Sequence, residues 1–311
     1  MQRTYLRFAQ PLLADLEIPY LEICGDQDGP TLTLLGGVHG CEYTSQAAVR
    51  EFFDVLDEGT LRGRVRAVPT LNVKAFYSRS PFVSPDDGKN LNRSFPGIAL
   101  GTYSEQLAYA VTENLIKGSD ALIDLHAGDL VEALEPFTLY EESDVTESSR
   151  ALAEAYGLRY SVFQRRQGKT VAGATSATAA DLGIPAIIAE SGGRGIMEDD
   201  AVARHILGLR RVTNHLDMTD FDTTEAPSVP IEHFATFHWI RSEHQGWWSP
   251  SVPVGARVHL GDTLGSVLDL LGVEQSSVVA PSDGVVLFQT SSPAVLSDGL
   301  LLGLAADAFE P

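Results

Sequence analysis

The sequence predicts an α/β fold, in which a domain with a mixed sheet is followed by a smaller domain of β-strands. Strand-length apolar runs alternate with segments of helical periodicity over residues 32–215. Glycines and polar residues gather where three of these apolar runs end. After residues 221–230, which have linker composition, the pattern changes to short strands and tight turns. With 311 residues, the chain can hold both domains, and we expect them at 1–220 and 221–311.

Each element of the first domain follows from its hydrophobic period. Strands are predicted where short apolar runs are bounded by turn residues, and helices where apolar residues recur every three or four positions. The predicted strands are residues 31–35, 65–73, 121–125, 137–140, 160–163 and 186–189. The predicted helices are residues 43–56, 105–116, 147–156, 178–182 and 198–216. We expect these helices to cover both faces of one mixed sheet.

The second domain is predicted to be all-β. Residues 258–265 and 280–286 resemble the barrel-sandwich fold of lipoyl and biotinyl carrier domains. A carrier domain needs a lysine for attachment, and the chain has no lysine after Lys169. The domain is therefore interpreted as a structural or gating module. Its three tryptophans could line a substrate entrance, but packing between the domains is the favoured interpretation, because large aromatic side chains usually supply buried area.

Charge and composition limit the possible partners. The formal net charge of −20 argues against nucleic-acid binding and against docking on anionic membranes. The N-terminus opens no apolar signal region, and no stretch approaches the length of a membrane span. The two cysteines provide no disulfide framework, which agrees with a reducing compartment. We therefore expect a cytoplasmic protein, and a homo-oligomer is compatible with these features.

Three short polar segments at the strand ends, called polar islands below, contain the candidate catalytic and metal-binding residues. His39, Glu42 and His126 supply two imidazoles and a carboxylate, a ligand set that holds a catalytic zinc ion with one position open for water. Asp124 shares a strand face with His126 and could hold its imidazole by a hydrogen bond. Glu190 could then activate the water. The islands are residues 36–42, 124–128 and 190–193.

For some of these residues, a purely structural role is the alternative interpretation. Either histidine alone would be read as a turn or core histidine, but both follow predicted strands beside glycines. Cys41 lies between His39 and Glu42 and is either a fourth, sulfur ligand or a small buried side chain. Burial is favoured, since free cysteine commonly packs in the interior.

A loop over residues 79–97 contains the candidate substrate-binding residues. Arg93 can grip a carboxylate with two parallel charge-assisted hydrogen bonds, and Asn92 can add a neutral donor and acceptor. Arg79 is a second cation, suited to the oxygen that becomes negative when an acyl carbon is attacked. For each arginine the alternative is a solvated surface charge.

Four ordered motifs together resemble the succinylglutamate desuccinylase/aspartoacylase family of zinc deacylases, relatives of the zinc carboxypeptidases. They are Gly37-x-His39-Gly40-x-Glu42, Asn90-Leu91-Asn92-Arg93-x-Phe95-Pro96-Gly97, Asp124-Leu125-His126 and Glu190-x-Gly192-Gly193. The resemblance implies a zinc-carboxypeptidase-like domain and one zinc ion per chain bound by His39, Glu42 and His126. It also implies that Glu190 is the general base and acid. Asn92 and Arg93 are then expected on the substrate carboxylate, and Arg79 on the scissile carbonyl.

The resemblance implies hydrolysis of the amide bond of a small anionic N-acylated substrate, an N-acyl amino acid. A carboxypeptidase acting on short peptides is an alternative, because the same residues also suit a terminal carboxylate. A zinc-dependent binding protein without catalysis is a second alternative. Glu190 speaks against it, because a site used only for binding does not need a base.

Overall fold

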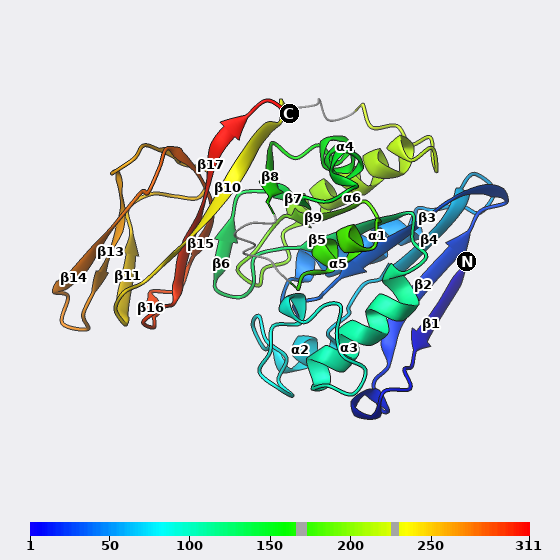
Figure 1. Ribbon diagram of the computed structural model, residues 1–311, viewed down its shortest axis with the longest axis horizontal. Coiled ribbons are helices and arrows are strands. Elements are labelled where there is room, and N and C mark those ends of the chain that lie inside the picture. Colours follow the sequence, from blue (N-terminus) through cyan, green and yellow to red (C-terminus); the bar gives the residue numbers. More distant parts are fainter. Residues whose placement is uncertain (166–172, 225–229) are drawn as a thin grey trace.

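One long sheet contains strands from both the N-terminal and the C-terminal parts of the chain (Figure 1). We describe it from a computed structural model, whose described residues are 1–165, 173–224 and 230–311. Over these residues the sheet has 13 strands, in the order β1-β2-β4-β3-β5-β9-β7-β8-β10-β17-β15-β12, with β6 paired to β15. The first half contains β1 (Gln2–Leu6), β2 (Ile18–Cys24), β3 (Gln27–Gly36), β4 (Arg62–Val68), β5 (Ala121–His126), β6 (Glu132–Leu134), β7 (Phe137–Glu141), β8 (Tyr160–Gln164) and β9 (Ala186–Glu190).

Helices cover both faces of this sheet, as predicted, because its central strands are apolar on both sides. On β5, Ile123 packs into one hydrophobic core and its neighbour Leu122 into the other. The first core is closed by α1 (Tyr43–Asp54), α4 (Thr146–Tyr156) and α6 (Asp199–His215). The second is closed by η1 (Pro11–Leu13), α3 (Tyr103–Val111) and η3 (Thr112–Ile116). The remaining helices are α2 (Val73–Ser78), η2 (Leu91–Arg93) and α5 (Thr175–Asp181).

Most elements predicted for the first domain are confirmed, and the differences lie at the edges. The strand predicted over residues 65–73 ends at Val68, because Pro69 has no N–H for the ladder and the chain turns. Asn72 then caps α2 by accepting a hydrogen bond from the Ala75 N–H at 3.3 Å. No strand was predicted before residue 31, although β1 and β2 extend the sheet there. The β1 side chains are mostly exposed, which hides the alternation that marks a half-buried strand.

The C-terminal part shares strands with the main sheet. β10 (Glu232–Arg241) pairs with β8, and β17 (Leu300–Phe309) and β15 (Gly284–Thr290) continue the ladder to β12 (Arg257–Val258). A second sheet of four strands packs on this extension through a core that includes Trp248. Its strands are β11 (Gly246–Pro250), β13 (Thr263–Leu268), β14 (Glu274–Val279) and β16 (Ala294–Val295).

The predicted domain boundary is therefore crossed by a continuous hydrogen-bonded ladder. The β-rich composition predicted after residue 230 is confirmed, and the division into two folding units stays a prediction. Part of the predicted linker, residues 225–229, lies outside the described residues. Among the helices that the structure describes, none combines the length and the apolar character needed to cross a membrane.

Candidate active site

The three polar islands meet at one edge of the sheet because the strands that precede them are parallel. β3, β5 and β9 are hydrogen-bonded neighbours, and their carboxyl ends point the same way. His126 is the direct register partner of Glu190. The edge formed by the carboxyl ends of parallel strands is where ligands bind in open α/β sheets. The predicted convergence of the islands is confirmed.

Two glycines explain the path that brings His39 and Glu42 to this edge. Gly37 has φ 64°, a left-handed conformation that turns the chain out of β3. At Gly40, a Cβ atom would lie only 2.3 Å from the backbone carbon of Ala75. Any larger residue would therefore push the loop away from α2. Glu42 is the last residue before α1 and is almost fully buried, with 2% of its surface exposed.

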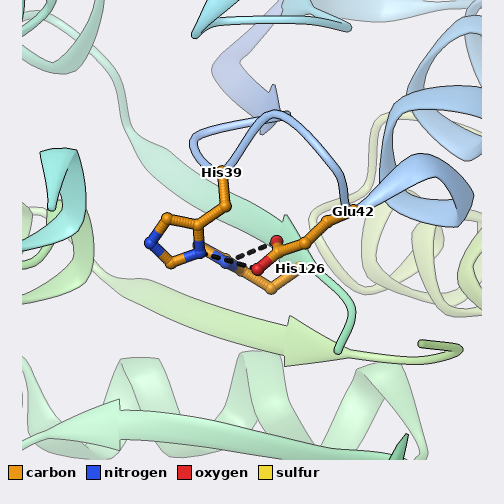
Figure 2. Close-up of side chains that lie close together, drawn as sticks. All are labelled: His39, Glu42 and His126. Carbon is orange, nitrogen blue, oxygen red and sulfur yellow. Dashed lines mark hydrogen bonds and ion pairs between the residues drawn. The ribbon is translucent and has the colours of Figure 1, made fainter. Parts of the chain in front are cut away.

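His39, Glu42 and His126 form one compact cluster (Figure 2). The Nδ1 atom of His39 lies 2.6 Å from Glu42 Oε1, and the Nδ1 atom of His126 lies 2.8 Å from Glu42 Oε2. The ligand atoms of the three residues all lie within 4.8 Å of one another. Two imidazole nitrogens and a carboxylate at this separation match the protein ligands of a hydrolytic zinc site.

The outer nitrogens of the two rings decide which atoms face the cluster. His39 Nε2 lies 3.0 Å from Asn90 Oδ1, and His126 Nε2 lies 2.9 Å from Asp124 Oδ2. Both partners accept hydrogen bonds, so each Nε2 carries the proton and each Nδ1 of a neutral ring presents a lone pair. These lone pairs face the Glu42 carboxylate. Such an arrangement of acceptors requires a cation between them, and the three residues therefore fit a metal ion.

Electrostatics agree with this donor set. Burial alone would lower the pKa of both histidines, but carboxylates prevail: the pKa of His39 is raised by Glu42, and that of His126 by Asp124 and Glu42. Although burial opposes it, the two rings lower the pKa of Glu42 to about 2. Positive charge is therefore stabilised at the centre of the cluster, whether a proton or a metal ion supplies it.

Asp124 is where the sequence analysis expected it, behind His126. It is completely buried, and the Thr175 hydroxyl donates to the same carboxylate oxygen that accepts from His126. Its second oxygen has no hydrogen-bond partner among the described residues. The hydrogen bond between Asp124 Oδ2 and His126 Nε2 fixes the tautomer and orientation of the imidazole.

Glu190 ends β9 beside His126 but is outside the group of three that share the close ligand geometry. Its Oε2 atom is buried and has no hydrogen-bond partner within the described part of the chain. Burial raises the pKa of Glu190 to about 8, with His126 opposing the shift and Glu42 adding to it. A carboxylate with a raised pKa near the cluster has the properties of a general base.

Asn92 and Arg93 belong to η2 and line the same cavity as the cluster. Asn92 is buried, its Oδ1 accepts from the Thr175 N–H at 3.0 Å, and its Nδ2 lies 3.3 Å from His126 Nε2. Arg93 donates from Nη1 to the Asn92 carbonyl at 2.7 Å and lines the cavity. Arg93 is therefore placed to meet a ligand, and Asn92 is held in place by the Thr175 N–H.

Two other candidates lie outside this arrangement. Arg79 ends α2 in a left-handed conformation, with φ 53°, and its exposed side chain is absent from the cavity lining. Cys41 is fully buried, and burial together with Asp129 raises the pKa of its thiol to about 11. A thiol that keeps its proton is a poor metal ligand, which supports the packing interpretation of Cys41.

A cavity of about 780 Å³ opens over the cluster, and both parts of the chain line it. Trp239 and Phe288 form an apolar wall, and their ring centroids are 5.8 Å apart. Trp239 lines the cavity and also packs on a core to which both regions contribute, whereas Trp248 is buried in the core of the second sheet and Trp247 is exposed. The lining residues that sequence reasoning missed include Phe82, Glu132, Arg241 and Phe288.

These residues carried little local signal. Glu132 follows the second island by a few residues, and an acidic side chain after a strand end could have been noted. Arg241 and Phe288 belong to C-terminal strands whose pairing no local pattern reveals.

Comparisons with known proteins agree with the geometry. Residues 28–216 match the model of the succinylglutamate desuccinylase/aspartoacylase catalytic domain. A protein of Halomonas elongata named N-alpha-acetyl-L-2,4-diaminobutyric acid deacetylase is 30% identical over 303 residues, which cover 91% of this chain and 84% of the relative.

Solved structures extend the similarity to the C-terminal strands. A succinylglutamate desuccinylase/aspartoacylase from Rhodobacter sphaeroides superposes with a TM-score of 0.86 at 25% identity, covering 98% of this chain and 95% of the other. The product-bound ectoine utilization protein EutE (DoeB) of Ruegeria pomeroyi gives 0.84 at 26% identity, covering 97% and 94%. The chain therefore belongs to the succinylglutamate desuccinylase/aspartoacylase family.

Proposed function

We propose that the protein is a metal-dependent amidohydrolase that removes the acyl group from a small N-acyl amino acid. The observation that carries the proposal is the meeting of two histidine lone pairs and the Glu42 carboxylate beside Glu190. The name of the Halomonas elongata relative supports the reaction class, since that protein is named a deacetylase of an acetylated amino acid.

His39, Glu42 and His126 would hold one ion of the zinc class. When bound, such an ion supplies a Lewis acid and lowers the pKa of a water molecule from about 15.7 to about 7. Asp124 and Asn90 keep the two imidazoles in the tautomer that this binding needs.

Glu190 accepts a proton as the oxygen of water attacks the amide carbon. The C–N bond then breaks, and Glu190 returns the proton to the departing nitrogen, so the products are a carboxylic acid and a free amine. Arg93 binds the carboxylate of the amino acid with its planar guanidinium, which orients the amide bond over the cluster. The predicted role of Arg79 at the scissile carbonyl stays a prediction, because its side chain lies outside the cavity lining.

The cavity walls favour small substrates over peptides. Residues of β10, β15 and β16 line the same cavity as the metal cluster, so the C-terminal part bounds the space available to a ligand. This supports an N-acyl amino acid rather than an extended peptide chain.

The decisive experiment combines metal removal with a Glu190→Gln variant. Hydrolysis of N-acetyl-2,4-diaminobutyrate, N-acetylaspartate and N-succinylglutamate is followed before chelation, after it, and after zinc is restored. We expect at least one substrate to be cleaved only with metal. Glu190→Gln should keep the metal, and its kcat should fall roughly 10²- to 10⁴-fold, the range for loss of general acid–base catalysis. Glu51→Gln, an exposed change on α1, is the control.

Two results would contradict the proposal. Full activity in metal-free protein would exclude the metal-dependent mechanism. Normal turnover in Glu190→Gln would remove Glu190 from the reaction, and loss of metal from that variant would make it a ligand instead.

A further inference from the structure

Most charged side chains that line the cavity already have a proposed role in metal binding, catalysis or substrate binding. His39, Glu42 and His126 belong to the metal cluster, Glu190 is the proposed base, and Arg93 is the proposed carboxylate clamp. Within the described lining, the charged residues that remain are Glu132 and Arg241.

Arg241 is already engaged by its own part of the chain. Its Nη1 atom donates to the Asp298 carbonyl at 2.6 Å, and it lies 4.0 Å from a carboxylate oxygen of Asp298. Half of its side chain is exposed, at 51%. Arg241 therefore supports the loop that carries Asp298, which is followed by the lining residue Gly299.

Glu132 differs, because no basic side chain of the described residues pairs with it within 4.0 Å. One carboxylate oxygen, Oε2, accepts from the Asp129 N–H at 2.9 Å. Its backbone is anchored on both sides, since its carbonyl accepts from the Arg194 N–H at 2.8 Å and β6 places it opposite Thr290 of β15. The carboxylate is thus held firmly at the cavity wall, where the two parts of the chain meet.

The charges around Glu132 are also negative. Burial raises the pKa of Glu132 well above its usual range, and Glu42, Asp129 and Glu190 add to the rise. A carboxyl group in such surroundings holds its proton, and it becomes ionised when a cation joins it. The charged groups that act on Glu132 are all carboxylates. A positively charged group of a ligand can therefore serve as its missing partner.

Arg93 and Glu132 line the same cavity as Glu190 but come from different elements, η2 and β6. A ligand whose amide bond lies at Glu190 can therefore direct its carboxylate toward Arg93 and another group toward Glu132.

We propose that Glu132 is a specificity-determining residue that binds a cationic amine on the side chain of the substrate. The preferred substrate is then an N-α-acylated diamino acid, and N-acyl dicarboxylates are disfavoured because Glu132 and the carboxylates around it offer their side chains no positive partner. This inference rests on the proposed deacylase function and names its substrate class. Trp239 and Phe288 supply apolar contact for the intervening methylene groups.

The test compares substrates that differ in side-chain charge. Wild-type and Glu132→Gln proteins, both zinc-loaded, are assayed with N-α-acetyl-2,4-diaminobutyrate, the nearly isosteric but neutral N-acetylnorvaline, and N-acetylaspartate. We expect the wild type to prefer the cationic substrate. In Glu132→Gln, kcat/KM for that substrate should fall about 10- to 100-fold, mainly through KM, as for loss of a charge-assisted hydrogen bond. The value for N-acetylnorvaline should stay within about threefold, since that substrate never made the bond.

Glu135→Gln removes the same charge from a residue nearby that does not line the cavity, and it should change neither value. Calorimetric binding of free 2,4-diaminobutyrate gives a readout apart from turnover, and its affinity should fall only in Glu132→Gln.

The outcomes separate this inference from the proposed function. If the wild type cleaves none of the three compounds or any other N-acyl amino acid, the proposed function itself fails. If it cleaves the cationic and neutral substrates equally, or if Glu132→Gln slows both by the same factor, deacylation stands and the role of Glu132 is refuted. Unchanged binding of 2,4-diaminobutyrate in Glu132→Gln also overturns it.

Discussion

The imidazole of His126 shows how single residues define the site. Its Nδ1 atom faces Glu42, and its Nε2 atom is held by the buried Asp124. The sequence analysis predicted this contact from the two-residue spacing on one strand face, and the structure confirms it. Asp124 binds no metal itself, but it keeps the lone pair of His126 pointed at the cluster.

We therefore predict that Asp124→Asn weakens metal binding without abolishing the fold. An amide accepts the His126 proton less strongly than a carboxylate does, so zinc affinity should fall roughly 10- to 100-fold, as for other partners of metal-ligand histidines. Competition with a chromogenic chelator measures this. Asp144→Asn, at an exposed position, should bind zinc as the wild type does, and equal affinity in both variants would contradict the role of Asp124.

Helix α6 is linked to the backbone of His126 by a chain of hydrogen bonds through His205. The Tyr156 hydroxyl of α4 lies 2.6 Å from His205 Nδ1, and His205 Nε2 lies 3.0 Å from the His126 carbonyl. Because a carbonyl only accepts, Nε2 must carry the proton and Nδ1 must accept from the tyrosine. His205 is thus held neutral, and burial lowers its pKa from 6.5 to about 4.

This arrangement makes the fold sensitive to acid. Between pH 6.5 and 4 the unfolded chain takes up a proton at His205 that the folded chain resists, so the stability contributed by neutral His205 is lost as the pH falls. The loss amounts to about 3 kcal/mol, from about 1.4 kcal/mol for each pKa unit. We expect His205→Gln to be less stable than the wild type at pH 7, and the gap to narrow toward pH 4.

Urea unfolding of metal-free protein at several pH values measures that gap, because it removes the separate effect of acid on metal binding. His215→Gln changes an exposed histidine at the end of the same helix and should track the wild type. A gap that stays constant from pH 7 to pH 4 would rule out the titration of His205 as its cause.

At the scale of the whole molecule, one hydrogen-bonded sheet connects the two sequence regions. β10 covers the edge of β8, with Phe234 opposite Val162. Phe137 stacks on Phe237 at a centroid distance of 5.8 Å, and β6 pairs with β15. The apolar core around these residues is built from both regions.

A chain shortened to residues 1–224 should therefore fail to fold as a stable monomer, although it keeps every proposed metal ligand. Removing β10 exposes an unpaired strand edge and uncovers Phe137, and both promote aggregation. Soluble yield, size-exclusion chromatography and thermal unfolding measure this. The double change Leu270→Ser and Leu271→Ser, at side chains 86% and 90% exposed, should leave the full chain folded. A soluble shortened monomer that unfolds at the wild-type temperature would show that the first region is an independent domain.

The sequence by itself determined the elements of the central sheet and the proposed metal ligands at its edge. Strand alternation, helical period and turn glycines act over a few residues, so local patterns reveal them. The positions of His39, Glu42, His126 and Glu190 follow from such patterns, because parallel strands bring their carboxyl ends to one edge.

Only the tertiary structure decided the shape and charge of the cavity. Glu132 reaches its wall because β6 pairs with β15, and Trp239 reaches it because β10 joins β8. Arg79 is the opposite case. It lies close in sequence to the motif that contains Asn92 and Arg93, but it does not line the cavity. Such placements depend on contacts between segments distant in sequence and on how their side chains fill the shared core. The period of hydrophobic residues along one segment carries no record of these contacts.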